Sequence, residues 1–379
     1  MLVTELFPPA VGGSAELFAG VYSRLQPRSV TILTQGDSAT GTGGSGDLDV
    51  QSARIRTEHW GLLNPAGLMH HLRLAARLRR ISRADRSVVH AGRVLPEGLA
   101  AWLARLMGGA RYACWAHGEE LNYAELSREL SVLMRRIYRD ADAILANSRN
   151  TAALVEAFGV GSDRIHVVHP GVDVRRFRPN VAGAAVLRTR IGRPNEIVLL
   201  TAGRLQRRKG HVLALRALAG LLPALPLRYV IVGDGEERGR LEQLADSLGV
   251  RDRVTFAGAV PAEELPAYYA AADLFVHPNR VEGGDFEGFG LVFLEAAASG
   301  LPVIGGASGG VPEAVQEGVT GVLVSGTDVE ELKAALRSFV TSPDRRRAMG
   351  QAGRAWAARF TWERAAETVA AAHDRIAVP

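Results

Sequence analysis

The stretch EIVLLTAGRLQRRKGHVLALRAL, residues 196–218, decides the fold class of this chain. It opens with a run of apolar residues, passes through a turn that contains Gly203 and Gly210, and continues with apolar residues at helical spacing. A continuous apolar run is typical of a strand buried on both faces, and a helix directly after it is typical of a parallel crossover. The stretch therefore predicts a strand–turn–helix unit of a parallel sheet.

The same pattern recurs along the whole chain. After a short opening strand at residues 1–4, apolar runs predict strands at 29–34, 87–91, 111–116, 142–146 and 164–168, and again at 196–201, 227–232, 253–256, 273–276, 301–304 and 321–324. Helical patterns lie between the strands, so we predict an α/β fold with doubly wound parallel sheets.

The two sets of strands predict two domains. Between them lies the run PGVDVRRFRP at 170–179, followed by Ala/Gly-rich sequence to residue 192, which we interpret as a linker. This predicts an N-terminal domain over 1–179 and a C-terminal domain over 193–359. The segment GDSATGTGGSG at 36–46 predicts a surface loop.

The composition excludes several classes of protein. The 379 residues are 47% hydrophobic and 22% charged, which excludes a largely disordered chain. Cys114 is the only cysteine, which excludes a disulfide scaffold. No apolar run approaches the roughly 18–20 residues of a membrane span, and the start MLVTELFPP lacks the features of a signal peptide. We therefore expect a cytoplasmic protein.

Arg204 and Lys209 follow the strand of the opening stretch. In open parallel sheets, ligands bind beyond the carboxyl ends of the strands. A guanidinium and an ammonium at one such point can neutralise a diphosphate. Lys209 is one of only two lysines among 45 basic residues, which favours a chemical role over the alternative, a solvated basic turn.

Two glutamates lie in the segment EGGDFEGFGLVFLEAAASGLPVI at 282–304. Glu287 falls in a glycine-rich loop, and Glu295 falls eight residues later in the next predicted helix. A continuous helix would place them about 12 Å apart along its axis, so that one carboxylate can bind a sugar and the other a ribose. Because glutamate is rarely buried without a partner, we expect Glu295 to be buried against a hydroxyl. A metal pair of Asp285 and Glu287 is the alternative; no His or Cys supports it, and we expect no metal.

Two further motifs belong to the first set of strands. In FPPAVGGSAELF at 7–18, Gly12 and Gly13 precede a predicted helix, whose free N–H groups can bind phosphate. The alternative is an ordinary strand-to-helix turn. In WAHGEE at 115–120, His117 follows a strand and is either part of a site or a structural histidine.

The basic charge of the chain is concentrated in residues 64–87, which hold six arginines and one acid. On a helix, one side carries Arg73, Arg77, Arg80 and Arg83, and the other carries Leu68, Leu74, Leu78 and Ile81. The apolar side is explained by packing on a sheet. For the basic side we predict contact with an anionic membrane surface or an anionic acceptor. No aromatic residues interleave with the arginines, so we expect no nucleic-acid partner.

The segment VIVGDGEERG at 230–239 is similar to a dinucleotide-binding motif but does not match it. Its glycines are spaced G-x-G-x-x-x-G, and Glu236 and Glu237 would face the pyrophosphate. An oxidoreductase is therefore not expected.

Together, these motifs resemble the retaining glycosyltransferases of family 4, which have the GT-B fold of two facing Rossmann domains with a cleft. The resemblance rests on FPPAVGG at 7–13, HGEE at 117–120, HPGVDVRRFRP at 169–179, GRLQRRKG at 203–210, and the two glutamates with seven residues between them. Within the family, the chain looks most like the bacterial mannosyltransferases that build phosphatidylinositol mannosides. Those typically carry a second histidine where this chain has Glu119, a departure that bears on the donor or the acceptor.

The resemblance implies roles for the residues near the donor diphosphate. Gly12 and Gly13 would contact it through their backbone, and Arg204 and Lys209 would stabilise the leaving nucleoside diphosphate. The family is usually metal-independent, and the departing phosphate oxygen is thought to take the proton of the acceptor on the same face of the sugar.

The resemblance also implies roles around the sugar and the nucleoside. Glu287 would hold the sugar hydroxyls, Glu295 would bind the ribose, and His117 would lie at the sugar O6. Backbone groups beside the sugar and the base would come from Phe289, Gly290, Leu291 and Val260. A final helix at 362–376, within the segment 360–379, would cross back to the N-terminal domain.

The expected function is transfer of a hexose (mannose, glucose or N-acetylglucosamine) from a GDP- or UDP-sugar to a hydroxyl acceptor, with no cofactor. The acceptor is expected to be lipid-linked or part of a cell-envelope glycoconjugate, with the enzyme peripheral on the inner membrane face. The alternatives are a hexosamine 2-epimerase of the same fold, which lacks the paired glutamates, and a catalytically silent nucleotide-sugar-binding protein.

Overall fold

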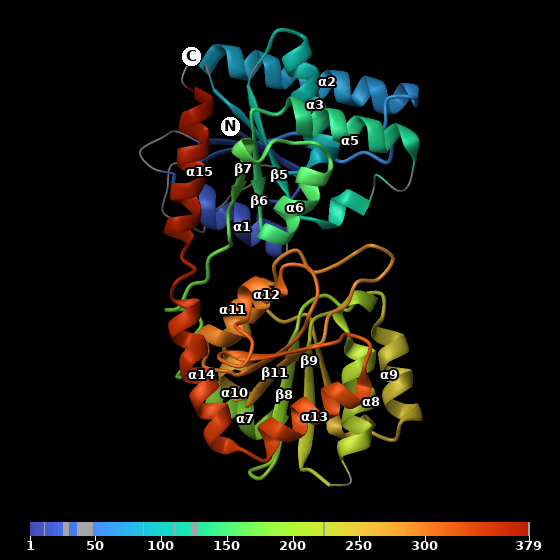
Figure 1. The fold of residues 1–379 in the computed structure, drawn as a ribbon, viewed down its shortest axis with the longest axis vertical. Coiled ribbons are helices and arrows are strands. Elements are labelled where there is room, and N and C mark those ends of the chain that lie inside the picture. Colours follow the sequence, from blue (N-terminus) through green and yellow to red (C-terminus); the bar gives the residue numbers. More distant parts are fainter. Residues whose placement is uncertain are drawn as a thin grey trace. The chain divides into compact units, whose positions relative to one another are not determined.

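A computed structural model describes residues 1–10, 12–25, 30–35, 48–85, 87–109, 111–122, 124, 127–222 and 224–377. The chain forms two compact units (Figure 1). The N-terminal unit comprises Met1–Gly171 and Trp362–Pro379, and the C-terminal unit comprises Val172–Thr361. Over the described ranges, no helix is long and apolar enough to cross a bilayer.

The N-terminal unit is built on a seven-stranded sheet with the order β3-β2-β1-β4-β5-β6-β7. Its strands are β1 (Leu2–Thr4), β2 (Val30–Thr34), β3 (Leu48–Ser52), β4 (Val89–Ala91), β5 (Tyr112–Ala116), β6 (Ala143–Ala146) and β7 (Ile165–Val167). All neighbouring strands pair in parallel, so their carboxyl ends share one edge of the sheet.

Helices cover both faces of this sheet (Figure 1). One core includes residues of α2 (Pro65–Asp85), α3 (Leu99–Leu106) and α5 (Arg128–Asp140), and the other includes residues of α1 (Gly13–Tyr22) and α15 (Trp362–Ala377). The other elements among the described residues of this unit are α6 (Arg149–Ala157), a π-helical turn (Val94–Gly98) and the 3-10 turns Glu119–Asn122 and Ser162–Arg164. A Cβ at Gly20 of α1 would lie 2.4 Å from the Trp362 ring, so only glycine lets the C-terminal helix pack this closely.

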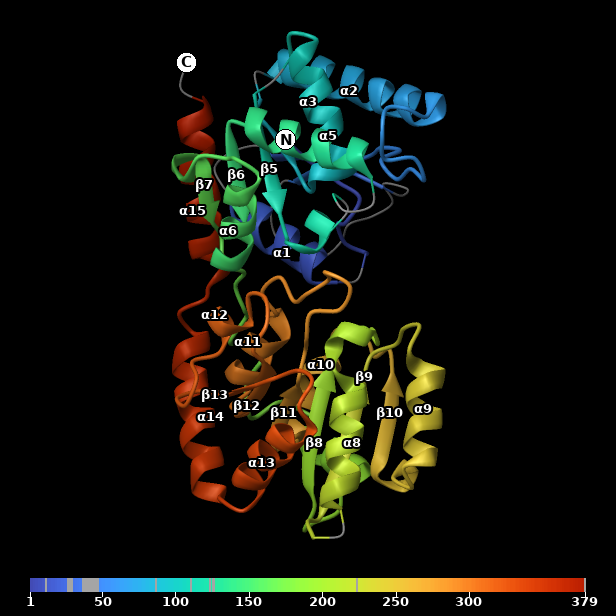
Figure 2. The ribbon, with the colours of Figure 1, turned by 45° about the vertical axis from the view of Figure 1, so that its right-hand side comes forward.

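The C-terminal unit contains a six-stranded parallel sheet with the order β10-β9-β8-β11-β12-β13 (Figure 2). Its strands are β8 (Ile197–Ala202), β9 (Leu227–Val232), β10 (Val254–Gly258), β11 (Leu274–His277), β12 (Val303–Gly306) and β13 (Gly321–Val324). The α/β class with doubly wound parallel sheets is thus confirmed in both units.

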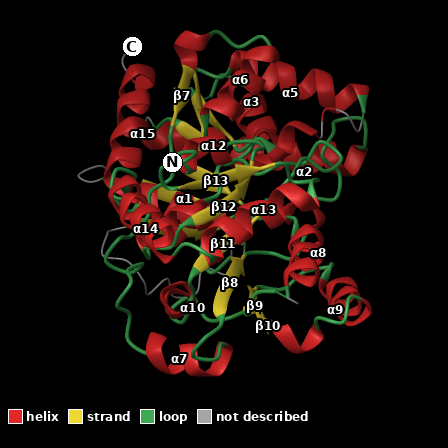
Figure 3. Ribbon diagram, turned by 60° about the horizontal axis from the view of Figure 1, so that its bottom comes forward, coloured by secondary structure: helices red, strands yellow, loops and turns green. Residues whose placement is uncertain are grey.

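Two hydrophobic cores flank this second sheet, and Figure 3 shows its strands surrounded by helices. One core includes residues of α8 (His211–Leu221), α9 (Arg238–Ser247) and α13 (Val329–Val340), and the other includes residues of α7 (Ala184–Ile191), α10 (Leu265–Ala271), α11 (Leu291–Ala298) and α12 (Val311–Ala314). The remaining elements are α14 (Pro343–Ala357) and the 3-10 turns Arg207–Lys209 and Arg251–Arg253.

The structure differs from the sequence-based expectation at two elements. Strand β3 was not predicted, because it is a partly exposed edge strand in which apolar and polar residues alternate. Helix α7 lies within the stretch that we interpreted as a linker, and Arg188 fastens it by donating to the Asp273 carboxylate at 2.6 Å. The predicted loop at 36–46 lies outside the described residues.

Candidate functional site

The loops at the carboxyl edge of the C-terminal sheet pack backbone against backbone. Gly210 has a positive φ of 77°, and a Cβ there would lie 2.0 Å from the Pro278 carbonyl oxygen. A Cβ at Gly306 would lie 1.7 Å from the Asn279 carbonyl oxygen. These glycines are therefore needed for the loops after β8, β11 and β12 to come together.

A charged cluster forms where these loops meet. The Lys209 ammonium lies 2.5 Å from Glu287 Oε2, and Arg208 Nη1 donates to the same oxygen at 3.0 Å. Arg208 Nε lies 2.9 Å from Asp285 Oδ2. We call these four residues the charged cluster. The structure thus brings two of the predicted site residues, Lys209 and Glu287, into direct contact.

The electrostatics of the cluster keep Glu287 ionised. Burial raises the pKa of this carboxyl, but Lys209 and Arg208 outweigh burial and lower the pKa to about 2. The Arg208 guanidinium forms ion pairs with both Asp285 and Glu287. These two carboxylates, which the sequence offered as a possible metal pair, therefore share an arginine side chain. Among the residues that the structure describes, no group of three His, Cys, Asp or Glu side chains is placed to bind a metal ion.

The loop that carries Glu287 packs closely against the backbone of Gly309 and Gly310. Gly310 N–H donates to the Glu287 carbonyl at 2.9 Å, and a Cβ at Gly309 would lie 2.1 Å from that oxygen. Phe289 is buried, and Gly290 precedes α11 with a positive φ of 89°. Leu291 begins that helix, so free backbone N–H groups lie next to the Glu287 loop.

Glu295 lies on α11 and accepts a hydrogen bond from the Tyr269 hydroxyl at 2.7 Å. Burial and the negative charge of Glu295 raise the pKa of Tyr269, so the phenol stays protonated and donates. The predicted hydroxyl partner is confirmed. The placement of Glu287 in a loop and of Glu295 in the helix that follows is also confirmed, and because α11 begins at Leu291 the separation of about 12 Å along a continuous helix does not apply. One detail was wrong: Glu295 is half-buried rather than buried.

Arg204 and Val260 lie outside the charged cluster. Arg204 is exposed in the loop after β8 and makes no ion pair with another described residue. Val260 is half-buried in the loop after β10. Sequence reasoning chose Arg204 as the partner of Lys209 and missed Arg208, whose only signal was its position next to Lys209 and Gly210.

In the N-terminal unit, His117 follows β5 and is held on several sides. Its Nε2 lies 2.9 Å from the Gly92 carbonyl oxygen, and its ring lies 5.6 Å from that of Phe18 in α1. Its backbone N–H donates to Glu120 Oε1 at 2.7 Å. Burial lowers the pKa of His117, so the ring is neutral. Nε2 then donates to Gly92, and Nδ1 carries no proton, so it has the chemistry of a hydrogen-bond acceptor.

Gly12 and Gly13 lie at the start of α1 on the same edge of the N-terminal sheet. Gly12 has a φ of 148°, which side chains rarely adopt, although a Cβ there would meet no atom of another described residue within 4 Å. Backbone conformation, rather than crowding, therefore calls for glycine. Open space beside a helix N-terminus fits the predicted phosphate contact.

The basic helix is α2, and its four predicted arginines divide into two pairs. Arg77 donates to the Ser52 carbonyl at 2.8 Å, and Arg83 donates to the Gly108 carbonyl at 2.6 Å. These two guanidinium groups are tied to the backbone of their own unit, so they have a structural role that the sequence did not reveal. Arg73 and Arg80 are exposed.

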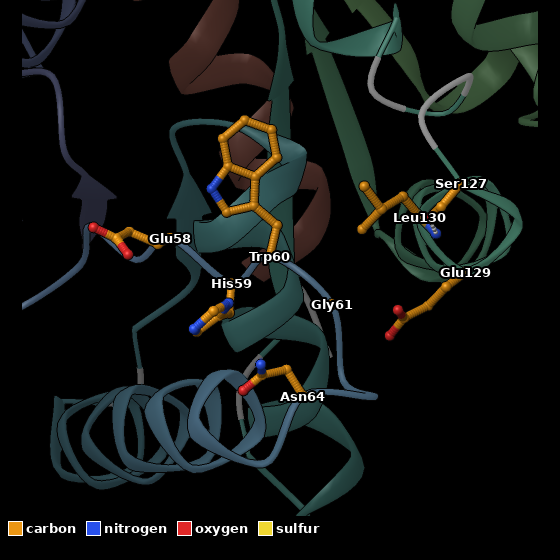
Figure 4. A pocket seen from close by; sticks show the side chains of 8 residues that line it. All are labelled: Glu58, His59, Trp60, Gly61, Asn64, Ser127, Glu129 and Leu130. Carbon is orange, nitrogen blue, oxygen red and sulfur yellow. Dashed lines mark hydrogen bonds between the residues drawn. The ribbon is translucent and has the colours of Figure 1, made fainter.

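A cavity of about 260 Å³ opens in the N-terminal unit between the loop at 58–64 and the start of α5 (Figure 4). Its lining includes Trp60, Asn64 and Glu129. Glu129 Oε1 accepts a hydrogen bond from the Leu62 backbone N–H at 2.5 Å, which fastens the loop to α5. None of the predicted site residues lines this cavity.

Glu97 is a fully buried carboxyl beside Arg93 in the N-terminal unit. Burial raises its pKa to about 8, although the Arg93 cation opposes the rise. In the unfolded chain Glu97 loses its proton above a pKa of about 4.5, whereas in the folded protein it keeps the proton up to about pH 8. The free energy of unfolding therefore falls as the pH rises from about 4.5 to about 8.

We expect Glu97→Gln to flatten this dependence. Between about pH 6 and about pH 8.5, the unfolding temperature of the variant should fall by about 5 °C less than that of the wild type. Differential scanning fluorimetry measures both slopes. Glu156→Gln, at an exposed carboxylate on α6, is the control and should keep the wild-type slope. Parallel slopes for Glu97→Gln and the wild type would contradict the assignment.

Two family models match the chain. The model described as "Glycosyltransferase Family 4" matches residues 11–176, and that described as "Glycosyl transferases group 1" matches residues 187–356. The chain is 38% identical over 364 residues to the GDP-mannose-dependent alpha-(1-6)-phosphatidylinositol monomannoside mannosyltransferase of Mycolicibacterium smegmatis, covering 94% of this chain and 93% of that protein.

A second relative and a solved structure extend the comparison. The chain is 32% identical to the GDP-mannose-dependent monoacylated alpha-(1-6)-phosphatidylinositol monomannoside mannosyltransferase of Corynebacterium glutamicum, over 96% of this chain and 94% of that protein. The crystal structure of Anabaena Alr3699/HepE in complex with UDP-glucose is similar with a TM-score of 0.81 at 22% identity, over 98% of this chain and 97% of that one. At this identity the likeness shows the fold alone.

Proposed function

Because this chain belongs to the family 4, group 1 glycosyltransferases of GT-B fold, and so transfers a sugar from a nucleotide donor, we propose that it carries mannose from GDP-mannose to a hydroxyl of a phosphatidylinositol mannoside. The names of the two nearly full-length relatives support this donor and acceptor. Family membership also sets aside the epimerase and the silent binding protein that the sequence left open.

The observation that carries the proposal is the contact of Lys209 with Glu287. It gives one site a cation for the leaving phosphate and a carboxylate for the sugar hydroxyls. In the proposed complex, Lys209 and Arg204 bind the diphosphate, with the N–H groups of Phe289, Gly290 and Leu291 beside the sugar. The remaining donor contacts come from Glu295 to the ribose, Val260 to the base, and Gly12 and Gly13 to the diphosphate.

The proposed reaction retains the configuration at the sugar C1. The bond from C1 to the phosphate oxygen breaks, the acceptor oxygen bonds to C1 on the same face, and its proton passes to the departing phosphate oxygen. His117 Nδ1 accepts a hydrogen bond from a sugar hydroxyl. Cationic side chains and the α11 N-terminus stabilise the leaving group, so the proposal includes turnover without a metal ion.

The test is a donor and acceptor assay with purified protein. GDP-mannose, UDP-glucose and UDP-N-acetylglucosamine are each supplied with phosphatidylinositol monomannoside, and both nucleotide release and the lipid product are measured. We expect a dimannosylated lipid from GDP-mannose alone. Product from a UDP-sugar, or nucleotide release without a lipid product, would contradict the proposed donor or acceptor.

We expect Glu295→Ala to weaken binding of GDP itself, because the proposed contact is to the ribose and needs no sugar. Losing a hydrogen bond to a charged group should cost about tenfold or more in Kd, as measured by calorimetry with GDP. Tyr269→Phe keeps the carboxylate and loses its hydroxyl partner, so it should cost less. A Kd for GDP that Glu295→Ala leaves unchanged would contradict the ribose contact.

The proposal also includes binding at an anionic membrane surface through Arg73 and Arg80, the exposed pair on α2. Basic side chains near such a surface contribute about 1 kcal/mol each, so Arg73→Ala/Arg80→Ala should weaken vesicle binding by about tenfold or more. Co-sedimentation with phosphatidylinositol-containing vesicles measures the loss. Arg175→Ala/Arg216→Ala removes two exposed arginines of the C-terminal unit as a charge-matched control. Equal binding by both double variants would contradict a role for α2.

A further inference from the structure

The loop that carries Glu287 begins with a tight turn at residues 282–285. Glu282 N–H donates to the Asp285 carbonyl at 2.9 Å, and Asp285 N–H donates to the Glu282 carbonyl at 3.0 Å. The two residues between them, Gly283 and Gly284, have positive φ angles of 57° and 82°. This backbone is typical of a two-residue hairpin turn, for which glycine is favoured. The turn therefore fixes the position of the Asp285 backbone, from which its side chain extends.

The turn is joined to the loop that carries the basic residues. Arg280 N–H donates to the Arg208 carbonyl at 2.8 Å, and Asp285 Oδ2 lies 2.9 Å from Arg208 Nε. The Arg208 side chain is only 11% exposed, so its position depends on these neighbours rather than on solvent. One edge of the guanidinium faces Asp285, and Nη1 faces Glu287.

The charges around Glu287 indicate what the Asp285 carboxylate contributes to the charged cluster. Lys209 and Arg208 both donate to the same oxygen of Glu287, so two cations crowd one anion. Asp285 supplies a second negative charge beside Arg208 Nε, so the guanidinium is paired with a carboxylate at each of two nitrogens. If a donor diphosphate drew Lys209 away from Glu287, Arg208 would remain as the cation on that carboxylate.

We propose that Asp285 is a positioning residue, which holds Arg208 so that Glu287 stays aimed at the sugar of the donor. The inference rests on the proposed function, because it assumes that Glu287 binds the sugar. It predicts that Asp285 affects recognition of the sugar and leaves recognition of the nucleotide unchanged. A general structural role, or a role of Arg208 on the phosphates, would affect both.

The test compares Asp285→Asn with Glu282→Gln. Glu282 lies in the same turn and pairs with Arg280 at 2.7 Å, so its variant removes an equal charge from the turn at a different arginine. For each variant we measure kcat and KM with GDP-mannose and the inhibition constant of GDP. Asp285→Asn should raise KM about tenfold and leave the inhibition constant of GDP within about twofold, as for the loss of one partly buried ion-pair partner. Glu282→Gln should leave both constants at wild-type values.

Two further measurements separate the possible outcomes. Asp285→Glu restores the charge on a longer side chain and should recover part of the lost KM; it also serves if Asp285→Asn does not fold. An unchanged KM in Asp285→Asn, or an equal loss for GDP-mannose and GDP, overturns the inference. A wild-type protein that uses a different sugar nucleotide overturns the proposed donor instead, and the same comparison is then made with that donor and its nucleotide.

Discussion

Lys209→Ala is expected to lower kcat by about 100- to 1000-fold, the loss that follows removal of one group that stabilises developing charge in a transition state. As C1 leaves the phosphate, negative charge grows on the departing diphosphate, and the Lys209 ammonium is held within reach of it by the loop after β8. An interaction that strengthens in the transition state raises kcat more than it tightens ground-state binding. The variant should therefore lose less than about tenfold in donor affinity.

The measurement is a steady-state comparison of kcat and KM for GDP-mannose, together with a calorimetric Kd for GDP. Lys333→Ala is the matched control, because it removes the only other lysine, which pairs with Glu330 on α13 far along the sequence. It should behave as the wild type. If Lys209→Ala lost affinity and turnover equally, Lys209 would be a binding group only.

Glu287→Gln is expected to lower both stability and activity. The side chain is 12% exposed, and its carboxylate faces Lys209 and Arg208, so the variant leaves two buried cations short of a partner. Breaking a buried pair by removing one partner costs about 3–5 kcal/mol. Turnover should fall by about 100-fold or more, because the sugar loses its charged acceptor. Binding of GDP alone should hold or tighten, since Lys209 is released for the diphosphate.

The pH dependence of this loss has a definite sign. The pKa of Glu287 in the folded protein, about 2, lies below its unfolded value of about 4.5, so its stabilising effect is fully present above about pH 4.5 and is lost as the pH falls toward 2. Thermal unfolding of the wild type and the variant should therefore differ most above that pH and converge in acid. Glu330→Gln, at a largely exposed carboxylate, should shift stability by about 0.5 kcal/mol or less. Equal unfolding temperatures for Glu287→Gln and the wild type at neutral pH would contradict a stabilising cluster.

Much of the fold could be predicted because most strands are buried on both faces and read as continuous apolar runs. Strands β9 and β13 have the predicted bounds, and other predicted strands differ by a few residues at their ends. Strand β3 could not be found in this way, since an edge strand needs only one buried face and alternates. Helix α7 was not predicted because its sequence is rich in Ala, Gly and Arg and was interpreted as a linker. In the structure, packing on α10 stabilises this helix.

Two residues of the charged cluster could be predicted from the sequence, because their residue type and the glycines beside them distinguish them from their neighbours. Lys209 and Glu287 were selected because one of only two lysines and a glycine-flanked glutamate both follow strands. Arg208 was missed, because arginine is common in this chain and no spacing rule distinguishes it from its neighbours. Asp285 was considered only as a metal ligand, and its partner became evident only when the loops were placed together.

The central claim is that the cation after β8 and the carboxylate after β11 bind opposite ends of the donor's sugar–phosphate bond. A crystal structure with GDP-mannose bound tests it most directly. We expect a phosphate oxygen within about 2.7–3.2 Å of Lys209 Nζ and a mannose hydroxyl at the same range from the Glu287 carboxylate. A donor bound elsewhere, with Lys209 still paired to Glu287, would show that these two side chains do not bind the sugar–phosphate bond.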